Sequence, residues 1–373
     1  MLSELLGPGL AGISSAYLAL TLFAVMWSRG RSNDYVGAAQ PISLLKPLHG
    51  DEPHLYENLK TFCVQDYRQY QIVFGLHRED DPALEVARRL QREFPRLDIE
   101  IVVSAQRHGS NPKVNNLINL LPKARHPWLV MADSDVSVTP YYLSVVSAPL
   151  ADPSVGTVTC LYRGRARAGL WSRLGAAFIN DWFAPSVLLT QLFGVQKYCA
   201  GATLALRAEV LKAIGGFEAV KDQLADDYWL GELPRRLGLC TVLSPMRVST
   251  DAAERSFAEL WAHDLRWMRT NRSLAPLGFA FLFVTLATPM LGLALLLSPV
   301  PVGIALVALG ALLRVGLHLA QNPLRFGDLL LIPVRDLLLL AQWAVAMSGG
   351  AVDWRGQRLR MDGQGSDKLR PRS

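Results

Sequence analysis

Hydrophobic residues follow two different patterns along the chain. Near each end they form long apolar runs, whereas between Pro41 and Arg272 short apolar segments alternate with amphipathic ones. Long apolar runs are typical of helices that cross a bilayer. Short apolar segments that alternate with helical ones are typical of a mainly parallel sheet covered by helices. We therefore expect a globular α/β domain that is flanked by membrane segments.

The first apolar run lies close to the N-terminus. Residues 9–27 carry no charge, and Arg29 and Arg31 follow them. A cleaved signal peptide carries its positive charges before its apolar core, not after it. Residues 1–30 therefore predict a transmembrane signal anchor whose N-terminus lies outside and whose following residues lie in the cytoplasm.

The second apolar region covers residues 277–350. No charged residue occurs from Leu277 to Leu313. This stretch is too long for one helix across a bilayer whose hydrocarbon layer is ~30 Å thick. The sequence "SPVPVG" at 298–303 interrupts the run and predicts a hairpin of two spans, the second of which ends near His318.

The last apolar run, residues 329–347, has charges in its middle. Arg335 and Asp336 would be costly in hydrocarbon, and such residues usually face protein or water. The basic tail, residues 351–373, favours the cytoplasm. A complete span would place that tail outside, so we expect an interfacial or re-entrant segment and a cytosolic tail.

The globular middle reads as alternating strands and helices. Strands are predicted at 42–47, 70–76, 98–104 and 128–132, and helices at 54–65, 83–94 and 112–124. Pro112 stands at a favoured first-turn position of the last helix. Residues 41–255 therefore predict a Rossmann-like domain with a mainly parallel sheet, and ligands bind beyond the carboxyl ends of strands in such sheets.

A pair of carboxylates follows the last of these strands. Asp133 and Asp135, in "ADSD", are separated by one residue, so they repel each other unless a positive group lies between them. Oxygen ligands of this kind suit Mg²⁺ or Mn²⁺, with phosphate oxygens completing the coordination. An Asx turn that caps the next helix is the alternative. The apolar strand before the pair favours the metal site.

Three further charged residues are candidates for the same site. Asp226 and Asp227 open a helix, where acidic residues are ordinary helix-terminal partners. The functional interpretation requires one of them to face the cleft as a general base for a hydroxyl nucleophile. Lys113 follows a turn rich in Gly and Pro, and it either contacts a nucleotide phosphate or remains a solvated surface lysine.

Two amphipathic segments are candidates for contact with lipid. Residues 256–275 have an apolar stripe and several arginines, which is typical of an interfacial helix. This helix is either an anchor alone, or Arg266 also holds a diphosphate and Trp267 forms a wall for a sugar or lipid. Residues 169–194 either line a lipid entrance at the interface or pack in the domain core, and Asp181 is a candidate contact to an acceptor hydroxyl.

Composition narrows the choice of partners. Charged residues make up 19% of the chain and the net charge is +6. This balance suits a phosphate-bearing ligand or an anionic membrane face. The globular part contains no basic run with interleaved aromatic residues, so nucleic acid is not an expected partner. The four cysteines contain no CxxC pair, so buried reduced thiols are expected rather than a zinc site or a disulfide framework.

Taken together, these motifs resemble the ceramide glucosyltransferase family. The segments "LLKPLHGDEPHLYENLKTFCVQDY", "DDPALEVARRL", "HGSNPKVNNLINLLP", "ADSD", "ADDYWLGE", "HDLRW" and "DWRGQRLR" occur in the order seen in that family. The chain is most similar to the bacterial branch associated with hopanoid biosynthesis. The resemblance implies a GT-A fold and an inverting transfer from a UDP-sugar to a membrane lipid.

The resemblance also implies roles for individual residues. Asp81 matches a family aspartate beside the nucleotide, Asp133 matches a second that binds metal and diphosphate with Asp135, and Asp227 matches the general base. Residues from His263 to Trp267 occupy the (Q/R)xxRW motif, with His263 in place of Gln or Arg. Of these, His263, Arg266 and Trp267 are expected to bind the nucleotide-sugar. Lys113 and Asn116 match a loop that contacts the nucleotide.

The expected substrates also come from the resemblance. We expect UDP-N-acetylglucosamine as donor and a hopanoid polyol such as bacteriohopanetetrol as acceptor, with UDP-glucose and ceramide as the alternative pair. A processive polysaccharide synthase would need more spans to form a channel, and a non-catalytic scaffold would have no use for the acidic residues. The expected location is the bacterial inner membrane, with several membrane segments and a cytosolic catalytic domain.

Overall fold

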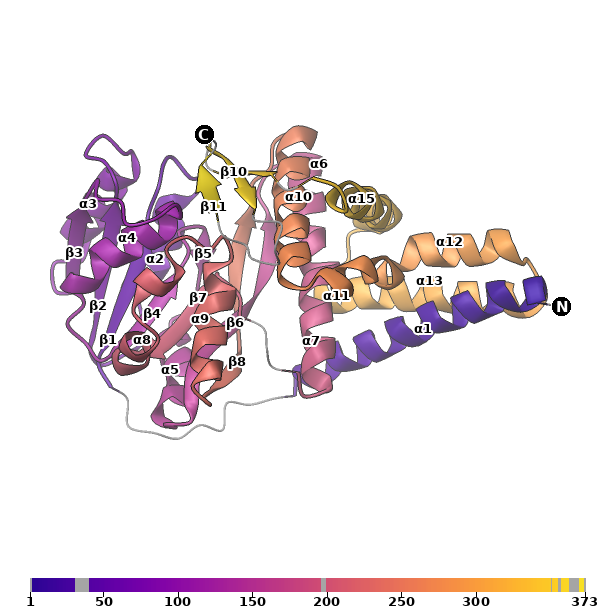
Figure 1. The fold of residues 1–373 in the computed structure, drawn as a ribbon, viewed down its shortest axis with the longest axis horizontal. Coiled ribbons are helices and arrows are strands. Elements are labelled where there is room, and N and C mark those ends of the chain that lie inside the picture. The colour runs from indigo at the N-terminus through magenta and orange to yellow at the C-terminus, as the bar shows by residue number, and fades with distance from the viewer. Residues whose placement is uncertain are drawn as a thin grey trace.

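The molecule consists of an α/β domain and a group of apolar helices that projects from it (Figure 1). The computed structural model describes residues 2–30, 40–195, 199–349, 351–354, 357–361 and 369–371. Arg31 lies outside the described residues, as do residues 355–356, 362–368 and 372–373 of the basic tail. All four cysteines lie in the described part and are free, but only three are buried, because Cys240 is exposed.

An eight-stranded sheet forms the centre of the α/β domain. Its order is β3-β2-β1-β4-β7-β6-β8-β5. The strands are β1 (Ile42–Pro47), β2 (Tyr70–Leu76), β3 (Asp98–Val103), β4 (Trp128–Ala132), β5 (Val136–Ser137), β6 (Val155–Ala166), β7 (Thr203–Arg207) and β8 (Cys240–Ala252). Strands β1 to β4 are parallel, β6 is parallel to β8, and β7 runs antiparallel between β4 and β6. The predicted α/β fold with a mainly parallel sheet is confirmed.

Helices cover both faces of this sheet. They are α2 (Leu55–Cys63), α3 (Ala83–Glu93), α4 (Pro112–Leu120), α5 (Tyr142–Ser147), α8 (Ala208–Ala213) and α9 (Asp226–Arg236), with short helical turns at η1 (Leu121–Lys123), η2 (Ala148–Ala151) and η4 (Phe217–Val220). Because side chains alternate along a strand, Leu44 and Leu45 of β1 belong to different hydrophobic clusters, one on each face. Two-sided burial explains why these strands read as continuous apolar runs.

Two long helices project from the domain side by side. They are α1 (Leu2–Ser28) and α13 (Pro301–Gln321), and both are long and apolar enough to cross a membrane. Both end at the domain, where Arg247 of β8 donates hydrogen bonds to Ser28 at 3.1 Å and to Gln321 at 2.9 Å. The ends of both helices are thereby tied to one strand of the sheet.

The predicted hairpin of two spans is only half present. The chain before α13 is divided into α11 (Pro276–Ala280), η5 (Leu282–Thr285) and α12 (Ala287–Leu297). The 11 residues of α12 extend about 16 Å, which is shorter than the hydrocarbon layer of ~30 Å. Asp336 accepts hydrogen bonds from the amide and hydroxyl of Thr288, and so provides a partner for a free backbone amide in the first turn of α12.

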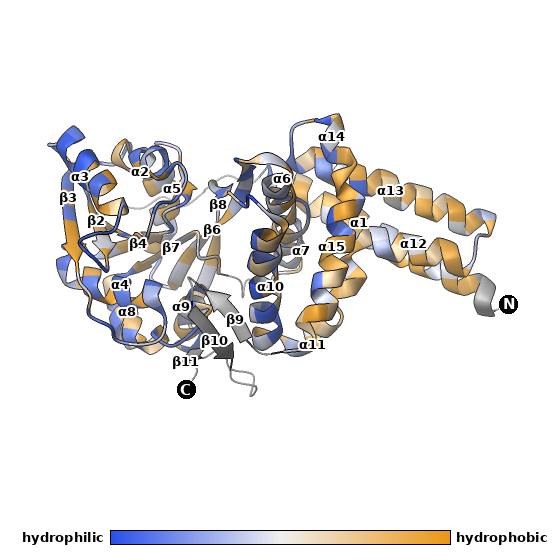
Figure 2. Ribbon diagram, turned by 90° about the horizontal axis from the view of Figure 1, so that it is seen from above, coloured by the Kyte–Doolittle hydropathy of each residue, from blue (hydrophilic) through white to orange (hydrophobic). Residues whose placement is uncertain are grey.

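The last apolar run forms α14 (Phe326–Leu329) and α15 (Leu331–Ala346). Residues 326–346 are also long and apolar enough to span a membrane. However, α15 runs at a steep angle to α1 and α13, since it is seen nearly end-on in Figure 1, where those two helices run lengthwise, and runs steeply to them in Figure 2. If α1 and α13 cross the bilayer, a helix at a steep angle to them lies close to its plane. This orientation favours the interfacial segment that the sequence predicts.

The tail then stays on the side of the domain. Residues 351–354, 357–361 and 369–371 form a small antiparallel sheet of β9 (Ala351–Trp354), β10 (Gln357–Met361) and β11 (Leu369–Pro371). In Figure 1 this sheet lies beside the α/β domain, away from the projecting ends of α1 and α13.

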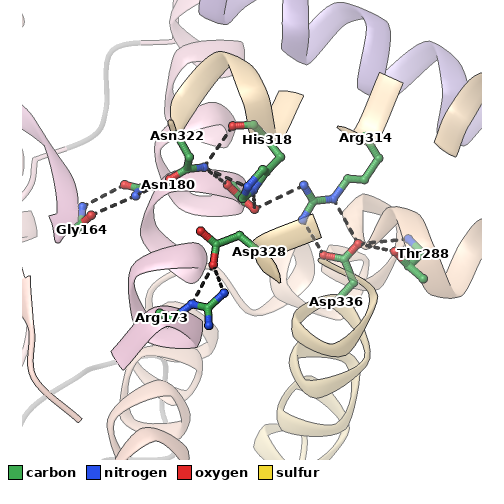
Figure 3. Close-up of polar contacts among 10 residues, drawn as sticks. Gly164, Arg173, Asn180, Thr288, Arg314, His318, Asn322, Asp328 and Asp336 are labelled. Carbon is green, nitrogen blue, oxygen red and sulfur yellow. Dashed lines mark hydrogen bonds and ion pairs between the residues drawn. The ribbon is translucent and has the colours of Figure 1, made fainter. Parts of the chain in front are cut away.

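Charged residues inside the apolar helices are paired with one another (Figure 3). Arg314 of α13 lies 2.9 Å from Asp336 of α15. Asp181 accepts hydrogen bonds from His318 at 2.7 Å and from Asn322 at 2.6 Å. The structure therefore does not support Asp181 as a contact to an acceptor hydroxyl, since its carboxylate is buried and engaged within this network.

The segment 169–194 joins the two parts of the molecule. It forms α6 (Gly169–Phe178), a π-helical turn η3 (Ile179–Phe183) and α7 (Ala184–Leu192). Within η3 the Asn180 side chain donates to the Gly164 carbonyl of β6 at 3.0 Å and accepts from its amide at 2.8 Å. Arg173 of α6 also pairs with Asp328 of α14 (Figure 3). The segment is thus packed between the sheet and the apolar helices.

The amphipathic helix α10 (Phe257–Leu274) lies against α6 and α15. It begins at a serine cap, and the Glu259 carboxylate accepts a hydrogen bond from the Arg255 amide just before it. The Ser256 hydroxyl accepts a hydrogen bond from the Glu259 amide at 3.2 Å. Leu260 and Met268 of the predicted apolar stripe are fully buried. Asp264 is buried as well, and its carboxylate lies 2.7 Å from the guanidinium of Arg335. The central charges of α15 are therefore used inside the protein.

Candidate active site

A cavity of about 500 Å³ lies beyond the carboxyl ends of β1 and β4. It is bounded by the turn after β4, the start of α9, and the helices α6 and α10. The predicted site residues that line it are Lys113, Asp133, Asp135, Asp227, His263, Arg266 and Trp267, together with Asp226. Residues from distant parts of the chain therefore meet in one hollow, where the sequence predicted a site.

Hydrogen bonds to neighbouring elements hold the turn that carries the two aspartates. The buried Lys46 ammonium of β1 donates to the Asp133 carbonyl. Asn58 of α2 donates to the Asp135 carbonyl at 3.3 Å, and the Thr250 hydroxyl donates to the Asp135 carboxylate at 2.5 Å. Burial, followed by the negative charge of Asp133, raises the pKa of the Asp135 carboxyl. An added cation would relieve this repulsion.

The start of α4 brings a lysine into the acidic group. Asn111 caps this helix by accepting a hydrogen bond from the Val114 amide, and its own amide group donates to the Gln223 carbonyl at 2.8 Å, just before α9. Lys113 is consequently placed 2.7 Å from the Asp133 carboxylate and 3.6 Å from Asp226. Its side chain is only 15% exposed, so the alternative of a solvated surface lysine does not hold.

A glycine marks the point where three charged groups converge. A Cβ atom on Gly201 would lie 3.2 Å from the Asp227 carboxylate, 3.4 Å from the Lys113 ammonium and 3.6 Å from the Asp133 carboxylate. Gly201 therefore leaves open the space that these groups share. A larger residue at this position would fill the floor of the cavity.

Asp227 has the properties of a general base near neutral pH. Burial and the neighbouring charge of Asp226 raise the pKa of its carboxyl to about 7. Asp226 beside it has a buried carboxylate oxygen without a hydrogen-bond partner among the described residues. A base whose pKa lies near the working pH is well suited to proton transfer. Both aspartates lie in the first turn of α9, but they also face the cavity, so capping alone does not describe them.

Aromatic side chains form the opposite wall. The Trp267 ring makes edge contacts with Tyr162, Phe178 and Phe183, with ring centroids 5.3 to 6.2 Å apart. Phe178 and Phe183 come from the helical segment that joins the domain to the apolar helices. The cavity thus has an acidic floor and an apolar wall that continues towards the membrane helices.

Two predicted site residues do not line the cavity. Asn116 is buried against Gly75, and its amide donates to the Gly75 carbonyl at 2.8 Å. The Asp81 carboxylate accepts hydrogen bonds from the amides of Gly50 and Ala83 at 2.9 to 3.1 Å. Asp81 thus holds the loop after β1, and Asn116 ties α4 to strand β2, so the structure supports a structural role for Asn116 rather than direct contact with the nucleotide.

Several charged residues at or near the cavity were not singled out in the sequence, among them Lys46, Asp251 and Glu254. Lys46 was detectable, since it is the single charged residue in a strand whose residues are all buried. Asp251 is neutralised by Arg165 at 2.8 Å and Arg167 at 2.9 Å. Glu254 pairs with His263 at 2.7 Å. Asp251 and Glu254 lie at and just after the end of β8, where no motif or spacing indicates that they reach the site.

The acidic floor fits a hard divalent cation. Asp133 and Asp135 present carboxylate oxygens on one turn, and Asp226 has a buried oxygen that accepts no hydrogen bond from the described residues, although the Lys113 ammonium lies 3.6 Å from it. The described residues contain no group of three or more histidines, cysteines and acidic residues that would enclose a metal ion alone. Mg²⁺ and Mn²⁺ are commonly held by one or two carboxylates together with substrate phosphates, so a two-aspartate set agrees with that mode of binding.

The chain matches a known family over most of its length. The model described as "Glycosyl transferase family 21" matches residues 10–367. Ceramide glucosyltransferases 1 and 3 of Caenorhabditis elegans are each 25% identical to this chain over 63% of its length, and the matches cover 50% and 51% of those relatives. The ceramide glucosyltransferase of Komagataella phaffii is 31% identical over 26% of this chain and 20% of its own. The chain spans about half the length of the C. elegans relatives.

A solved structure shares the overall architecture. It is described as mannosyltransferase PcManGT from Pyrobaculum calidifontis in complex with GDP-Man and Mn²⁺, and it aligns with a TM-score of 0.56 over 92% of this chain and 98% of its own. The sequence identity is 18%, so this likeness concerns the fold. The predicted GT-A fold and the resemblance to ceramide glucosyltransferases are confirmed, whereas the closer likeness to the hopanoid branch stays a prediction.

Proposed function

Because the chain belongs to glycosyl transferase family 21, we propose that it transfers a sugar from a UDP-sugar to a hydroxyl group of a membrane lipid. The observation that carries this proposal is the convergence of Lys113, Asp133 and Asp227 around Gly201, in a cavity whose other wall is aromatic. An acidic floor suits a metal-bound diphosphate, and an apolar wall suits a lipid. A binding protein without catalysis would have no need for a carboxyl group whose pKa is raised to about 7.

In this proposal the floor of the cavity holds the donor. Asp133 and Asp135 would hold Mg²⁺ or Mn²⁺, which neutralises the diphosphate when bound. Lys113 and Arg266 add positive charge where the leaving group develops negative charge. The solved mannosyltransferase contains a nucleotide-sugar and Mn²⁺, which agrees with this assignment. Trp267 stacks beside the sugar or the lipid head.

Asp227 accepts the proton of the attacking hydroxyl. The lipid oxygen forms a bond to the anomeric carbon, the bond between that carbon and the phosphate oxygen breaks, and UDP leaves with the bonding electrons. The proton passes to the Asp227 carboxylate. One displacement without a covalent intermediate inverts the anomeric centre, so no pair of carboxylates with the spacing of a retaining enzyme is required.

Two pairs of substrates are candidates. The sequence resemblance favours UDP-N-acetylglucosamine with a hopanoid polyol such as bacteriohopanetetrol. The curated relatives named ceramide glucosyltransferases favour ceramide, with UDP-glucose as donor. In either case we infer a location at the bacterial inner membrane, with the catalytic domain on the cytosolic side. The positive residues after α1 support that side.

The test is lipid mass spectrometry with the purified full-length protein. Each UDP-sugar is offered with each lipid in the presence of Mn²⁺, and one combination should give a glycolipid of the expected mass. Asp227→Asn should lower turnover by about 100- to 10,000-fold and leave UDP binding intact. Asp152→Asn is the matched control, because Asp152 lies on an exposed turn, where its carboxylate accepts hydrogen bonds from Ser154. Full turnover by Asp227→Asn would exclude Asp227 as the base, and no product from any pair would refute the lipid acceptor.

A further inference from the structure

A histidine and a glutamate form a pair on the wall of the cavity that the family motif does not contain. His263 stands at the first position of the motif, where Gln or Arg is the family pattern. Its Nδ1 lies 2.7 Å from a carboxylate oxygen of Glu254. The Glu254 side chain is 9% exposed, whereas the His263 side chain is 39% exposed and lines the cavity. The pair therefore has a buried end and an end that faces the ligand space.

The carboxylate determines which nitrogen of the imidazole carries the proton. Burial raises the pKa of the Glu254 carboxyl group, but its contacts with His263 outweigh burial, so the net shift is downward and favours the ionised form. An ionised carboxylate only accepts hydrogen bonds, and Nδ1 is therefore the donor. In the neutral ring, Nε2 then carries a lone pair that is available to a ligand in the cavity.

The packing keeps this pair in one orientation. His263 and Trp267 are four residues apart on α10, so their side chains are neighbours on one face of the helix. Their rings meet edge to face with centroids 5.6 Å apart. On the other side, Glu254 is pressed against α6, where a Cβ atom on Gly175 would lie 2.6 Å from the second carboxylate oxygen. Only glycine leaves room for the carboxylate there. The imidazole is thus fixed between an aromatic ring and a buried acid.

The charge of the pair disfavours a diphosphate partner. With a neutral imidazole the pair carries one negative charge, and with a protonated imidazole it carries none. The adjacent charges do not change this balance, because Asp264 is paired with Arg335 at 2.7 Å and Asp251 is paired with Arg165 and Arg167. A diphosphate requires positive partners, which Lys113 and Arg266 supply. A hydroxyl group, by contrast, donates a hydrogen bond to a neutral imidazole.

We propose that His263 binds a second hydroxyl group of the lipid acceptor through Nε2, and that Glu254 is the positioning residue that fixes its ring. The acceptor is then a lipid whose head carries at least two hydroxyl groups, one that attacks and one that His263 recognises. This inference rests on the proposed function, since it assigns the acceptor side of the same cavity. It replaces the expectation that His263 binds the nucleotide-sugar.

The experiment compares two acceptors that differ by one hydroxyl group. Ceramide is compared with its 3-deoxy analogue, or bacteriohopanetetrol with the hopanoid triol that lacks one of its hydroxyl groups, according to which parent lipid is turned over. A site that bonds a hydroxyl rejects the analogue without it, and one hydrogen bond predicts a preference of about fivefold in kcat/KM. In His263→Phe, which keeps an aromatic ring against Trp267, this preference should vanish while the KM for the donor and the affinity for UDP stay unchanged.

Two further variants separate recognition from simple packing. Glu254→Gln leaves the ring in place but no longer fixes its tautomer, so it should lose part of the preference. His126→Phe is the matched control, because His126 precedes β4 at the opposite end of the sheet, and this variant should keep the preference. If His263→Phe keeps the preference, or loses UDP affinity instead, the inference is wrong even though the enzyme is a lipid glycosyltransferase. If the wild-type protein glycosylates neither parent lipid, the proposed function itself fails.

Discussion

The buried ion pair between α10 and α15 allows a quantitative prediction about stability. Arg335 and Asp264 lie 2.7 Å apart, and their side chains are 1% and 3% exposed. The Asp264 carboxylate also accepts a hydrogen bond from Gln342 at 2.9 Å. Replacing Arg335 by Leu leaves a buried carboxylate without its counter-ion. Breaking a buried pair in this way costs about 3–5 kcal/mol, because the remaining charge is neither hydrated nor compensated.

A second substitution should recover most of this loss. In the double variant Asp264→Asn/Arg335→Leu both charges are absent. The Asp264→Asn substitution keeps a side-chain carbonyl oxygen, which can still accept the hydrogen bond from the Gln342 amide. Replacing a buried ion pair by uncharged residues is often nearly neutral. The Arg335 guanidinium also lies over the Phe178 ring, 4.9 Å from its centroid. The double variant should therefore remain less stable than the wild type by about 1 kcal/mol.

The assay is thermal unfolding of the purified protein in detergent, followed by intrinsic tryptophan fluorescence. A loss of about 3–5 kcal/mol corresponds to a fall in Tm of roughly 6–20 °C for a domain of ~200 residues. Arg335→Leu should show this fall, and the double variant should regain most of it. If the double variant is no more stable than Arg335→Leu, the uncompensated carboxylate is not the cause and the reasoning is refuted. Arg92→Leu, at an exposed pair on α3, should change Tm little.

Three further predictions concern the cavity. The kcat/KM of the wild type should rise as the pH increases through about 7, because Asp227 must be ionised to accept a proton. In Asp226→Asn this rise should move to lower pH, because the neighbouring charge that raises the pKa of Asp227 is absent. A pH-rate profile that is the same in both proteins would contradict this. Chelation of divalent ions should abolish transfer, and added Mn²⁺ or Mg²⁺ should restore it; activity that persists in EDTA would exclude a metal role for Asp133 and Asp135. Lys46→Met should raise the KM for the donor by about tenfold, since the Asp133 carbonyl loses its ammonium partner, whereas Lys60→Met on the surface should not; equal KM values in the two variants would show that Lys46 does not position the turn.

The sequence predicted the α/β domain well because its strands are buried on both faces. The strands at 42–47, 70–76 and 128–132 have the predicted ends, since an apolar run bounded by turn residues leaves little choice of boundary. The two aspartates after β4 were also detectable, because a charged pair directly after a buried strand is conspicuous. Such local patterns are enough to place residues at the carboxyl edge of a sheet.

Interactions between distant segments were much harder to predict. The first of the two spans in the predicted hairpin was expected to be complete, but Asp336, which is 48 residues from Thr288 along the chain, accepts hydrogen bonds at the point where α12 begins. Glu254 and His263 meet only because Gly175 of α6 leaves space for a carboxylate. Asn116 matched a family loop, yet it serves the main chain of Gly75. None of these contacts follows from hydropathy or spacing.

The bonds from Arg247 to the ends of α1 and α13 have a consequence for regiochemistry. Strand β8 runs directly from Arg247 to Thr250 at the cavity. Three residues of a strand extend about 10 Å. If α1 and α13 cross a bilayer and the proposed function holds, the candidate carboxylates would lie at a fixed, short height above the lipid headgroup layer. Among the hydroxyl groups along an extended lipid headgroup, only those at the height of the carboxylates would receive the sugar.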